Sequence, residues 1–482
     1  MYRSLRNQKG AMLIQVIAFL AIGVLMLSGI MGWGLASVKL AKHGQYREQA
    51  LQAAEAGIDY YRWHLAHDAT DFYDGQGATS TGPYIHDFLD KDGVRIGQFE
   101  LTITPPPPGS SIVTIKSKGV VDAEASAART IVERVAKPSY AKYAFVTNAT
   151  STYYGAGDDI YGELYSNGVL RFNSPAKAHS LVSSMIGSTT DPYYGKVWGA
   201  SCTGDPTPPT MYTNASCPSI FLAGRTINAP QISFNNLALD LSSLRTKAIA
   251  NGNYYADSGA KGYVMVLKTN DTYDLYRVNT VRSTPGGCSN TYSETGWGIW
   301  SVNTRTLIGN YPFPADGIIF ITDDLWLEGQ IDGAHITVAA GRNAGGGALK
   351  PNANIIINNN LLYTNKDGSD AIGVIAENSF IVGLYSADNL EIDAAIIAEK
   401  GATRRNYYSS NCSATYYKRT SLKIFGMMVS NQQGYFVWTS GGFVNSGYAA
   451  QPVQYDGNLL YSPPPSFPLT TDQYQIISWD EI

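Results

Sequence analysis

The feature that most constrains this chain is a long apolar run near its N-terminus. No charged residue occurs from Ala11 to Val38, and a helix needs about 20 apolar residues to cross the hydrocarbon core of a bilayer. Residues 39–68 continue the run without a proline, and their apolar side chains recur at helical spacings of three and four. These positions are Tyr46, Ala50, Ala54, Ile58, Tyr61 and Leu65. The sequence therefore predicts one helix over residues 11–67, apolar in its first half and amphipathic in its second.

The leader before this run is short and basic. Its ten residues, MYRSLRNQKG, include Arg3, Arg6 and Lys9 and end in Gly10. Because basic flanks of an apolar helix tend to stay in the cytoplasm, we expect residues 1–10 there and the rest of the chain beyond the membrane. The leader, the glycine before the apolar run and the continuation QYREQALQAAEAGIDYYRW resemble type IV pilin-like proteins with a PilX-type minor pilin N-terminal region.

The resemblance implies a processing site and an assembly residue. A prepilin peptidase would cut after Gly10, Ala11 would become the methylated first residue, and the membrane segment 11–38 would pack with other pilin-like subunits. The family usually carries a glutamate four residues after the first mature residue, which pairs with a neighbour's terminal amine. This chain has Gln15, whose carboxamide hydrogen-bonds but carries no charge. The departure favours a low-copy position, at the tip or in priming, over the shaft of a filament.

Three other interpretations of the apolar run remain open. It is also compatible with a plain signal anchor, or with a cleaved secretory signal cut near Leu35-Ala36-Ser37. A buried core helix is disfavoured by the length of the run, and a cleaved signal by the amphipathic continuation. Whether the run is a pilin-like helix, a plain signal anchor or a cleaved signal, we expect the rest of the chain to be extracytoplasmic. For the pilin-like interpretation the chain is first a single-pass membrane protein and then part of a surface pilus.

Composition indicates a turn-rich exported β protein. Charged residues make up 15% of the chain, and it contains 48 glycines and 33 tyrosines, whereas about 25% charged residues is usual. A net charge of −4 provides no basic footprint for nucleic acid. The expected fold class is therefore mainly β with one long N-terminal α-helix.

The four cysteines indicate disulfides. No C-x-x-C spacing and no histidine cluster accompanies them, so a zinc site is not expected. In an exported chain a sparse, even set favours disulfides over free thiols. We expect the pairs Cys202–Cys217 and Cys288–Cys412, with four free thiols as the alternative.

The rest of the chain predicts two β domains. Residues 68–138 contain the strand-like runs GQFELTIT, SIVTIKSKGVV and ARTIVERVA, which predict a small antiparallel meander on the helix. Over residues 139–482 short apolar runs such as NANIIINNNLLYTN recur between Gly, Asn and Asp corners, as in the coils of a solenoid. We expect a β-helix-like solenoid there, with an insertion at about 176–315. This pattern of short apolar runs and polar corners resembles β-helical domains downstream of PilX-like N-termini. A large β-sandwich or an irregular barrel is the alternative.

Candidate chemistry is sparse. The acidic pairs are interpreted as solenoid corners, because adjacent side chains on a strand point to opposite faces, and the two adjacent arginines as a solvated loop pair. These residues are Asp158–Asp159, Asp323–Asp324, Glu391 with Asp393, and Arg404–Arg405. No catalytic residue, metal site or cofactor is expected.

The sequence is compatible with two functions. The first is a minor pilin-like structural subunit whose head acts in surface interaction or adhesion, with a surface glycan or protein as possible ligand. The alternative is a membrane-anchored extracellular carbohydrate-active β-helix enzyme. Glycosidases need two carboxylates at a fixed separation, so a groove with convergent carboxylates favours the enzyme, and one without them favours the interaction role.

Overall fold

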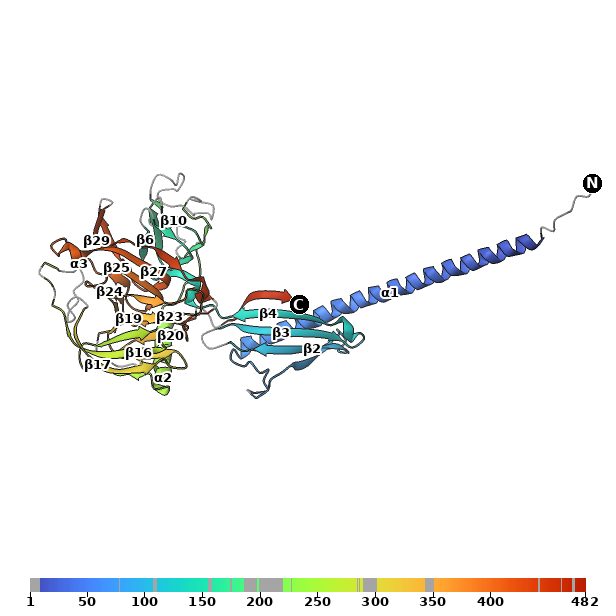
Figure 1. Cartoon of the computed structure of the whole chain (residues 1–482), viewed down its shortest axis with the longest axis horizontal. Helices are drawn as coiled ribbons and strands as arrows, with labels where there is room; N and C mark the ends of the chain where they lie inside the picture. Colours follow the sequence, from blue (N-terminus) through green and yellow to red (C-terminus); the bar gives the residue numbers. More distant parts are fainter. Residues whose placement is uncertain are drawn as a thin grey trace, which may run out of the picture. The chain divides into compact units, whose positions relative to one another are not determined.

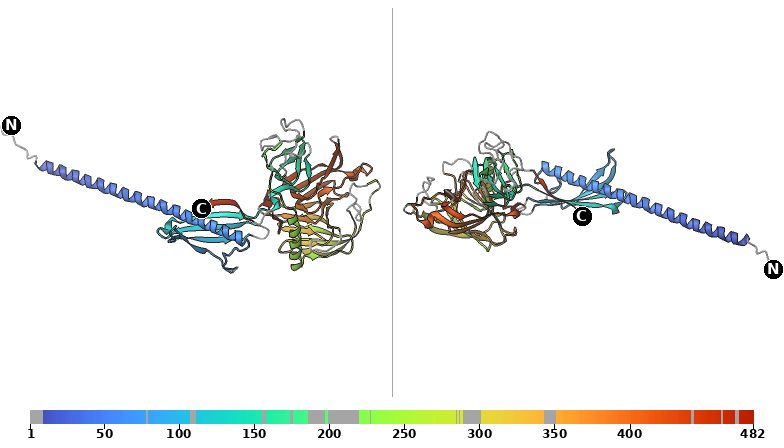
Figure 2. Two further views of the ribbon diagram at one scale, coloured as in Figure 1. Left: turned by 180° about the vertical axis from the view of Figure 1, so that it is seen from behind. Right: turned by 90° about the horizontal axis from the view of Figure 1, so that it is seen from above.

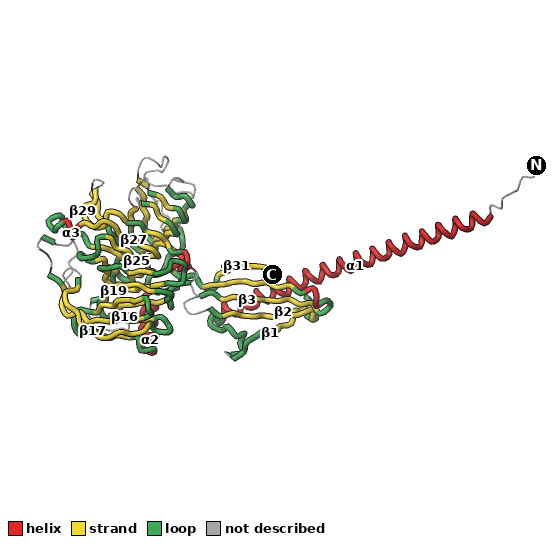
Figure 3. Tube along the Cα trace, viewed as in Figure 1, coloured by secondary structure: helices red, strands yellow, loops and turns green. Residues whose placement is uncertain are grey.

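A computed structural model shows that the chain forms two compact units (Figures 1 and 3). One unit comprises Met1–Pro105, Val113–Ala136 and Gln473–Ile482, and the other Pro106–Ile112 and Lys137–Asp472. The structure describes residues 9–482 except 78, 107–110, 155–157, 174–175, 186–196, 199–219, 227, 284, 286, 289–300, 343–350, 441–442, 461 and 470–472. The expected fold class is confirmed: mainly β, with one long N-terminal helix, a small antiparallel sheet and larger mixed sheets.

Helix α1 (Lys9–His67) changes character along its length. From Met12 to Leu40 its large apolar side chains are exposed on every side, and the helix is long and apolar enough to span a membrane. From Ala50 onward one face is buried, and its buried residues are Ala50, Ala53, Ala54, Ile58, Tyr61 and Leu65. An apolar surface of this extent is stable only against lipid or protein, so the first half of α1 needs an apolar environment that its own unit does not provide.

The second half of α1 lies on a five-stranded antiparallel sheet (Figure 2). Its strands, in spatial order, are β1 (Tyr84–Leu89), β2 (Arg95–Thr104), β3 (Val113–Val121), β4 (Arg129–Ala136) and β31 (Gln475–Glu481). Alternate side chains of β3 are buried, as expected for a strand with one covered face. The core combines Phe99, Leu101, Ile115 and Ile131 of the sheet with Ile58, Tyr61 and Leu65 of the helix.

Strand β31 corrects the expected boundary at the C-terminus. The sequence predicted that residues 139–482 form one domain, but β31 pairs with β4, with Ile476 opposite Val135 and Glu481 opposite Ile131. The larger unit is therefore inserted between two adjacent strands of the small sheet. Local periodicity does not report which distant strand a segment will pair with, so the sequence did not indicate this pairing.

The larger unit is built from three stacks of parallel strands. Stack A contains β14 (Tyr254–Tyr255), β18 (Ile318–Ile321), β20 (His335–Ala340), β23 (Ala371–Ala376), the ends of β25 (Asn389–Ala398) and β27 (Lys418–Ser430), β5 (Tyr143–Thr147), β8 (Glu163–Ser166), β11 (Val182–Ser184) and β13 (Arg225–Thr226). Stack B contains β15 (Tyr263–Lys268), the start of β19 (Leu325–Ile331), β21 (Ile355–Ile357), β24 (Phe380–Val382) and β26 (Thr403–Arg405). Stack C contains the end of β19, β22 (Leu361–Tyr363), the starts of β25 and β27, β29 (Phe443–Ala450) and β30 (Val453–Tyr455).

The remaining elements of this unit are shorter or lie outside the stacks. Two further parallel groups are β6 (Ser151–Tyr154) with β9 (Val169–Asn173) and β12 (Val197–Trp198), and β7 (Asp159–Ile160) with β10 (Lys177–Ala178). The others are α2 (Asn235–Ala250), β16 (Thr272–Val281), β17 (Val302–Pro312), α3 (Ala414–Tyr417) and β28 (Val437–Ser440). Several strands between 176 and 315, including β11, β13, β14 and β15, belong to the stacks, so that interval is not the single insertion that the sequence predicted.

Spatial order in stack A differs from chain order. The first strand of the unit, β5, pairs with β27, which comes near its end, with Phe145 opposite Met428. Asn148 donates a hydrogen bond of 2.7 Å to Asn431 across this junction, and Asn167 donates one of 2.8 Å to Asn148 on the next coil. This ladder of paired carboxamides joins the early and late halves of the unit, and it satisfies the side chain of Asn167, which is buried.

Two of the three stacks are covered on their outer faces. Helix α2 and residues 456–460 and 462–467 pack on stack A, where Leu244, Leu459 and Phe467 share one buried cluster with Ile318, Phe320 and Ile375. The hairpin β16–β17 packs on stack B, where Val278 joins Val264 and Trp326. Stack C carries polar side chains on its outer face, at Gln330, Glu391 and Lys423, and these stay partly or fully exposed.

Candidate functional site

The expected processing site lies at the start of α1. Helix α1 begins at Lys9, so Gly10 and Ala11 belong to its first turn, while residues 1–8 lie outside the described part. Gln15 is exposed one turn further on, within the segment long enough to span a membrane. The cut between Gly10 and Ala11, and the assembly role of Gln15, stay predictions.

Close backbone contacts hold the buried half of α1 on its sheet. A Cβ atom at Gly119 of β3 would lie 1.9 Å from the carbonyl oxygen of Ala50, and one at Gly57 of α1 would lie 2.3 Å from the Ser117 hydroxyl. Glycine at both positions allows helix and strand to approach more closely than side chains would permit. The direction in which the apolar half of α1 leaves its unit is set by these contacts.

Two histidine–carboxylate contacts brace the loop that follows α1. His64 lies 3.0 Å from Asp71, and His86 of β1 lies 2.8 Å from Asp74. His64 and His86 each contact one carboxylate, and the described residues contain no group of three or more His, Cys, Asp or Glu side chains placed to hold a metal.

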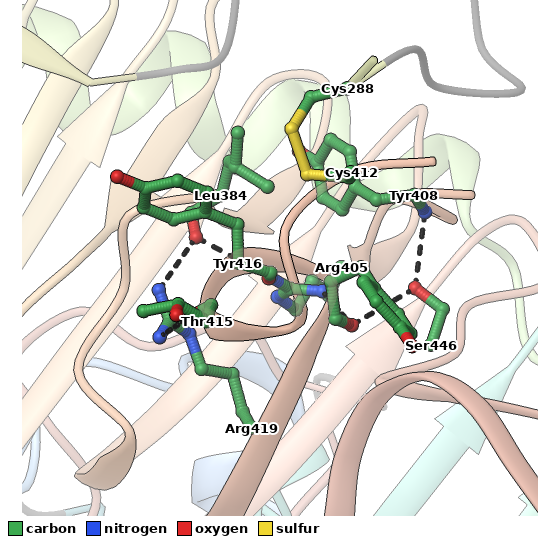
Figure 4. The surroundings of a disulfide bond; sticks show 10 residues. Cys288, Leu384, Arg405, Tyr408, Cys412, Thr415, Tyr416, Arg419 and Ser446 are labelled. Carbon is green, nitrogen blue, oxygen red and sulfur yellow. Dashed lines mark hydrogen bonds between the residues drawn. A yellow bond between two sulfur atoms is a disulfide. The ribbon is translucent and has the colours of Figure 1, made fainter. Parts of the chain in front are cut away.

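A disulfide joins Cys288 to Cys412 above a buried arginine (Figure 4). Arg405 is fully buried and donates hydrogen bonds to the carbonyl oxygens of Tyr416, Tyr417 and Leu384. The sequence predicted that Arg404 and Arg405 form a solvated loop pair, and this is wrong for Arg405. The loop that follows β26 and carries Cys412 folds back over β26 and encloses the Arg405 side chain.

Burial also sets the electrostatics of this cluster. Burial lowers the pKa of Arg405 to about 10, because the charged guanidinium is removed from water. Arg419 beside it donates a hydrogen bond of 2.9 Å to the Leu384 carbonyl oxygen. Both arginines donate to backbone carbonyls in the described part of the chain, so the cluster fixes the fold of the loop. Cys202 and Cys217, the other expected pair, lie outside the described residues.

The acidic pairs do not all lie in turns: Asp323 and Asp324 precede β19 in a turn, whereas Glu391 and Asp393 lie within β25 and Asp159 is the first residue of β7. Asp323 and Asp324 both accept hydrogen bonds from Arg342, at 2.8 Å for Asp324. They converge on one arginine because they are in a turn, whereas adjacent side chains of a strand point to opposite faces. Burial raises the pKa of Asp324, and Arg342 opposes that shift.

The carboxylates of the other two acidic pairs also have partners. Lys366 bridges Glu391 at 2.9 Å and Asp393 at 2.8 Å, while exposed Asp159 contacts His179 at 3.0 Å. Burial by itself would raise the pKa of Glu391, but hydrogen bonds from Lys423 and Lys366 outweigh it and hold the pKa below its usual value. Among the described residues, none of the three predicted pairs presents two unengaged carboxylates.

A groove of about 930 Å³ lies on the open face of stack C. It runs from the turn between β15 and β16 across β19, β22 and the segment before β25. Its polar side chains include Lys268, Glu328, Gln330, Asn359, Asn360 and Asn389, and its apolar ones Val266, Leu362 and Ala387. The volume is in the range of small-molecule and oligosaccharide-sized sites, about 300–1,000 Å³.

One carboxylate lines this groove, and it is already engaged. Glu328 lies 3.4 Å from Arg305 of β17 and accepts a hydrogen bond from Asn359. Lys268 contacts Asp274 at 2.7 Å at one end, and Gln330 donates a hydrogen bond of 3.0 Å to Thr364. The sequence did not predict this set of residues. They come from four separate coils, and the local pattern around each one is that of an ordinary turn or strand.

Comparisons with known proteins give little further information. No family model matches the chain, and no curated protein matches it. Among solved structures, the chain is similar to the competence-associated pilin ComZ from Thermus thermophilus. The two share 14% sequence identity at a TM-score of 0.32, over 91% of this chain and 97% of that chain. A similarity at this level carries no argument about this chain's fold or function.

Proposed function

We propose that this chain is a pilin-like subunit that is first held in a membrane by residues 11–38 and is then assembled into a surface filament. The observation that carries the proposal is the division of α1. Its first half exposes apolar side chains on all sides, and its second half is buried on a small antiparallel sheet. A subunit that moves from a bilayer into a filament needs both halves, because the apolar half exchanges lipid for the helices of its neighbours.

The insertion of the larger unit supports a low-copy position. That unit includes residues 137–472 and leaves and re-enters the small sheet between β4 and β31. In a close-packed shaft every subunit would have to accommodate a head of this size, whereas at a tip only one would. Gln15 agrees with this position, because an unpaired carboxylate inside a bilayer costs about 2.5–3.5 kcal/mol on insertion scales, and a tip subunit has no neighbour above it to supply an amine.

The groove supports an interaction role over the enzyme alternative. Hydrolysis of a glycosidic bond uses an acid and a second carboxylate about 5–9.5 Å away. Among the described residues that line the groove, Glu328 is the one carboxylate, and Arg305 and Asn359 engage it. We infer that the head binds a ligand and does not cleave one.

Immunogold labelling of the head on intact filaments tests the position. We expect label at filament ends in the wild type, and label extending into shafts only when Gln15→Glu restores a carboxylate that a neighbour's amine can meet. Gln15→Ala is the matched control, since it removes the carboxamide without adding charge, and we expect it to stay at the ends. Label distributed along wild-type shafts would refute the low-copy position.

A further inference from the structure

We propose that the groove on stack C binds a neutral, extended glycan of β-1,4-linked pyranose units. The proposal rests on the proposed function, because it names the ligand class of the head of a surface subunit. Stack C is the stack whose outer face is left open in the described part of the unit, whereas α2 and the hairpin β16–β17 cover the other two.

The chemistry of the groove matches hydroxyl groups. Four carboxamides line it, at Gln330, Asn359, Asn360 and Asn389. Each already makes one hydrogen bond within the protein, as a donor at Gln330 and Asn359 and as an acceptor at Asn360 and Asn389. A carboxamide has two N–H donors and an oxygen with two acceptor sites, so each keeps further donor and acceptor capacity for a ligand. Leu362 and Ala387 provide apolar surface between them. A pyranose has the same pattern, with hydroxyl groups at its rim and C–H groups on its faces, so sites of this mixed kind orient a sugar by polar contacts and hold it by apolar burial.

The spacing of the groove matches the repeat of such a chain. Leu267 of β15 pairs with Gly329 of β19, Gly329 pairs with Leu361 of β22, and Leu361 pairs with Ile392 of β25, so these four strands lie side by side in that order. Neighbouring strands lie about 4.8 Å apart, close to the length that each β-1,4-linked pyranose adds to an extended chain. Successive sugars would therefore meet equivalent positions on successive coils.

The pairing of the strands argues against a peptide ligand. An extended peptide usually binds by adding a strand to an open sheet edge. Strand β15 is paired with β16 and β19, and β22 is paired with β19 and β25, so neither offers a free edge in the groove. Peptide binding by strand addition is therefore not available at this site.

The charge of the groove argues against a polyanion. Lys268 is the one lysine that lines it among the described residues, and it contacts Asp274. Binding of nucleic acid or another polyanion draws on several lysines or arginines that release counterions. A neutral glycan makes no such demand.

Titration calorimetry of the full-length chain in detergent micelles tests the proposal. The probes are hexasaccharides of β-1,4-linked glucose, N-acetylglucosamine and xylose. No aromatic ring lines the groove among the described residues, so we expect a Kd of about 0.1–1 mM for at least one probe. Gln330→Arg places a larger side chain in the groove and should weaken binding by about tenfold or more.

The matched control lies on the same stack. Gln454 is exposed on β30, outside the groove, so Gln454→Arg should leave the Kd within about twofold. Binding that is equally strong in Gln330→Arg, or no binding of any probe, would overturn the glycan proposal. The mature N-terminus of the same sample reports separately on the proposed function, since a chain that starts at Ala11 and binds no glycan refutes only the ligand.

Discussion

At the scale of single residues, buried charges in this protein depend on partners from neighbouring coils. Lys366 is the clearest case, because it contacts both Glu391, which is partly exposed, and Asp393, which is fully buried. Burial raises the pKa of Asp393, while Lys366 and the backbone N–H of Tyr363 oppose the shift. Asp393 thus depends on its partners to remain charged inside the fold.

We expect Lys366→Met to reduce the free energy of unfolding by about 3 kcal/mol at neutral pH, because it leaves a buried carboxylate without its cation. Asp393 has a raised folded pKa, so its ionised form is the one that destabilises the fold. The loss should therefore be full well above the folded pKa and should shrink as pH falls toward about 3.9, the unfolded value. Urea unfolding at several pH values measures it.

The matched control for this prediction is Lys423→Met. Lys423 contacts Glu391 at 2.7 Å, and Glu391 is a third exposed, so its removal should cost no more than about 1 kcal/mol. Equal losses in the two variants, or a loss in Lys366→Met that persists at low pH, would show that Asp393 does not depend on Lys366.

At the scale of elements, the contact between α1 and β3 governs the small unit. A glycine-to-alanine substitution should have different effects in the buried and the exposed parts of α1. Gly57→Ala would place a Cβ 2.3 Å from the Ser117 hydroxyl and 2.8 Å from the Phe99 ring, whereas Gly44→Ala would meet nothing within 4 Å. We expect Gly57→Ala to cost about 1–3 kcal/mol through overpacking and Gly44→Ala to be neutral or slightly stabilising.

Hydrogen exchange of the β3 amides in the full-length chain measures this effect. Faster exchange in Gly57→Ala and unchanged exchange in Gly44→Ala are the expected results. Unchanged exchange in both variants would mean that the sheet tolerates the extra methyl group, and that the close contact does not fix the position of the helix.

The disulfide is a second element-scale feature. Cys288 and Cys412 are separated by 124 residues, and in the loop-entropy model the closure of a loop of that length is worth about 4–5 kcal/mol. We expect Cys412→Ser to lower the stability of the larger unit by up to this amount and to expose the loop over Arg405 to protease. If Cys412→Ser unfolds at the same denaturant concentration as the wild type, the disulfide does not support this loop.

Local pattern accounts for much of this architecture. The helical spacing from Tyr46 to Leu65 predicted the buried face of α1, and the alternation in residues 95–136 predicted strands β2, β3 and β4. Runs such as Ile355–Ile357 and Leu361–Tyr363 predicted the short strands of the stacks. These features depend on neighbours in the chain, which a sequence displays directly.

Contacts between distant segments were not predictable in this way. Strand β31 pairs with β4, and β27 pairs with β5, across most of the length of the larger unit. The sequence predicted a solvated Arg405 side chain, but the loop that Cys412 joins to Cys288 buries it. The groove likewise gathers side chains from four coils, so no single stretch of sequence indicates it.

At the scale of the whole molecule, processing and fold are linked through α1. If the proposed function holds, the apolar half of the helix enters a filament only after the basic leader is removed, because Arg3 and Arg6 are expected to keep the uncut N-terminus in the cytoplasm. We expect Gly10→Val to leave the chain uncut in the membrane, since a branched side chain would replace the small residue before the cut. Gly23→Val, further along α1 with open space around it, should still be processed.

The mass of the mature N-terminus tests the central claim most directly. Purified from its native membrane, the chain should begin at Ala11 with one methyl group on its amino terminus. A chain that begins at Met1 would indicate a plain anchor, and one that begins near Ser37 would indicate a cleaved secretory signal. Either result would contradict the account of this protein as a pilin-like subunit.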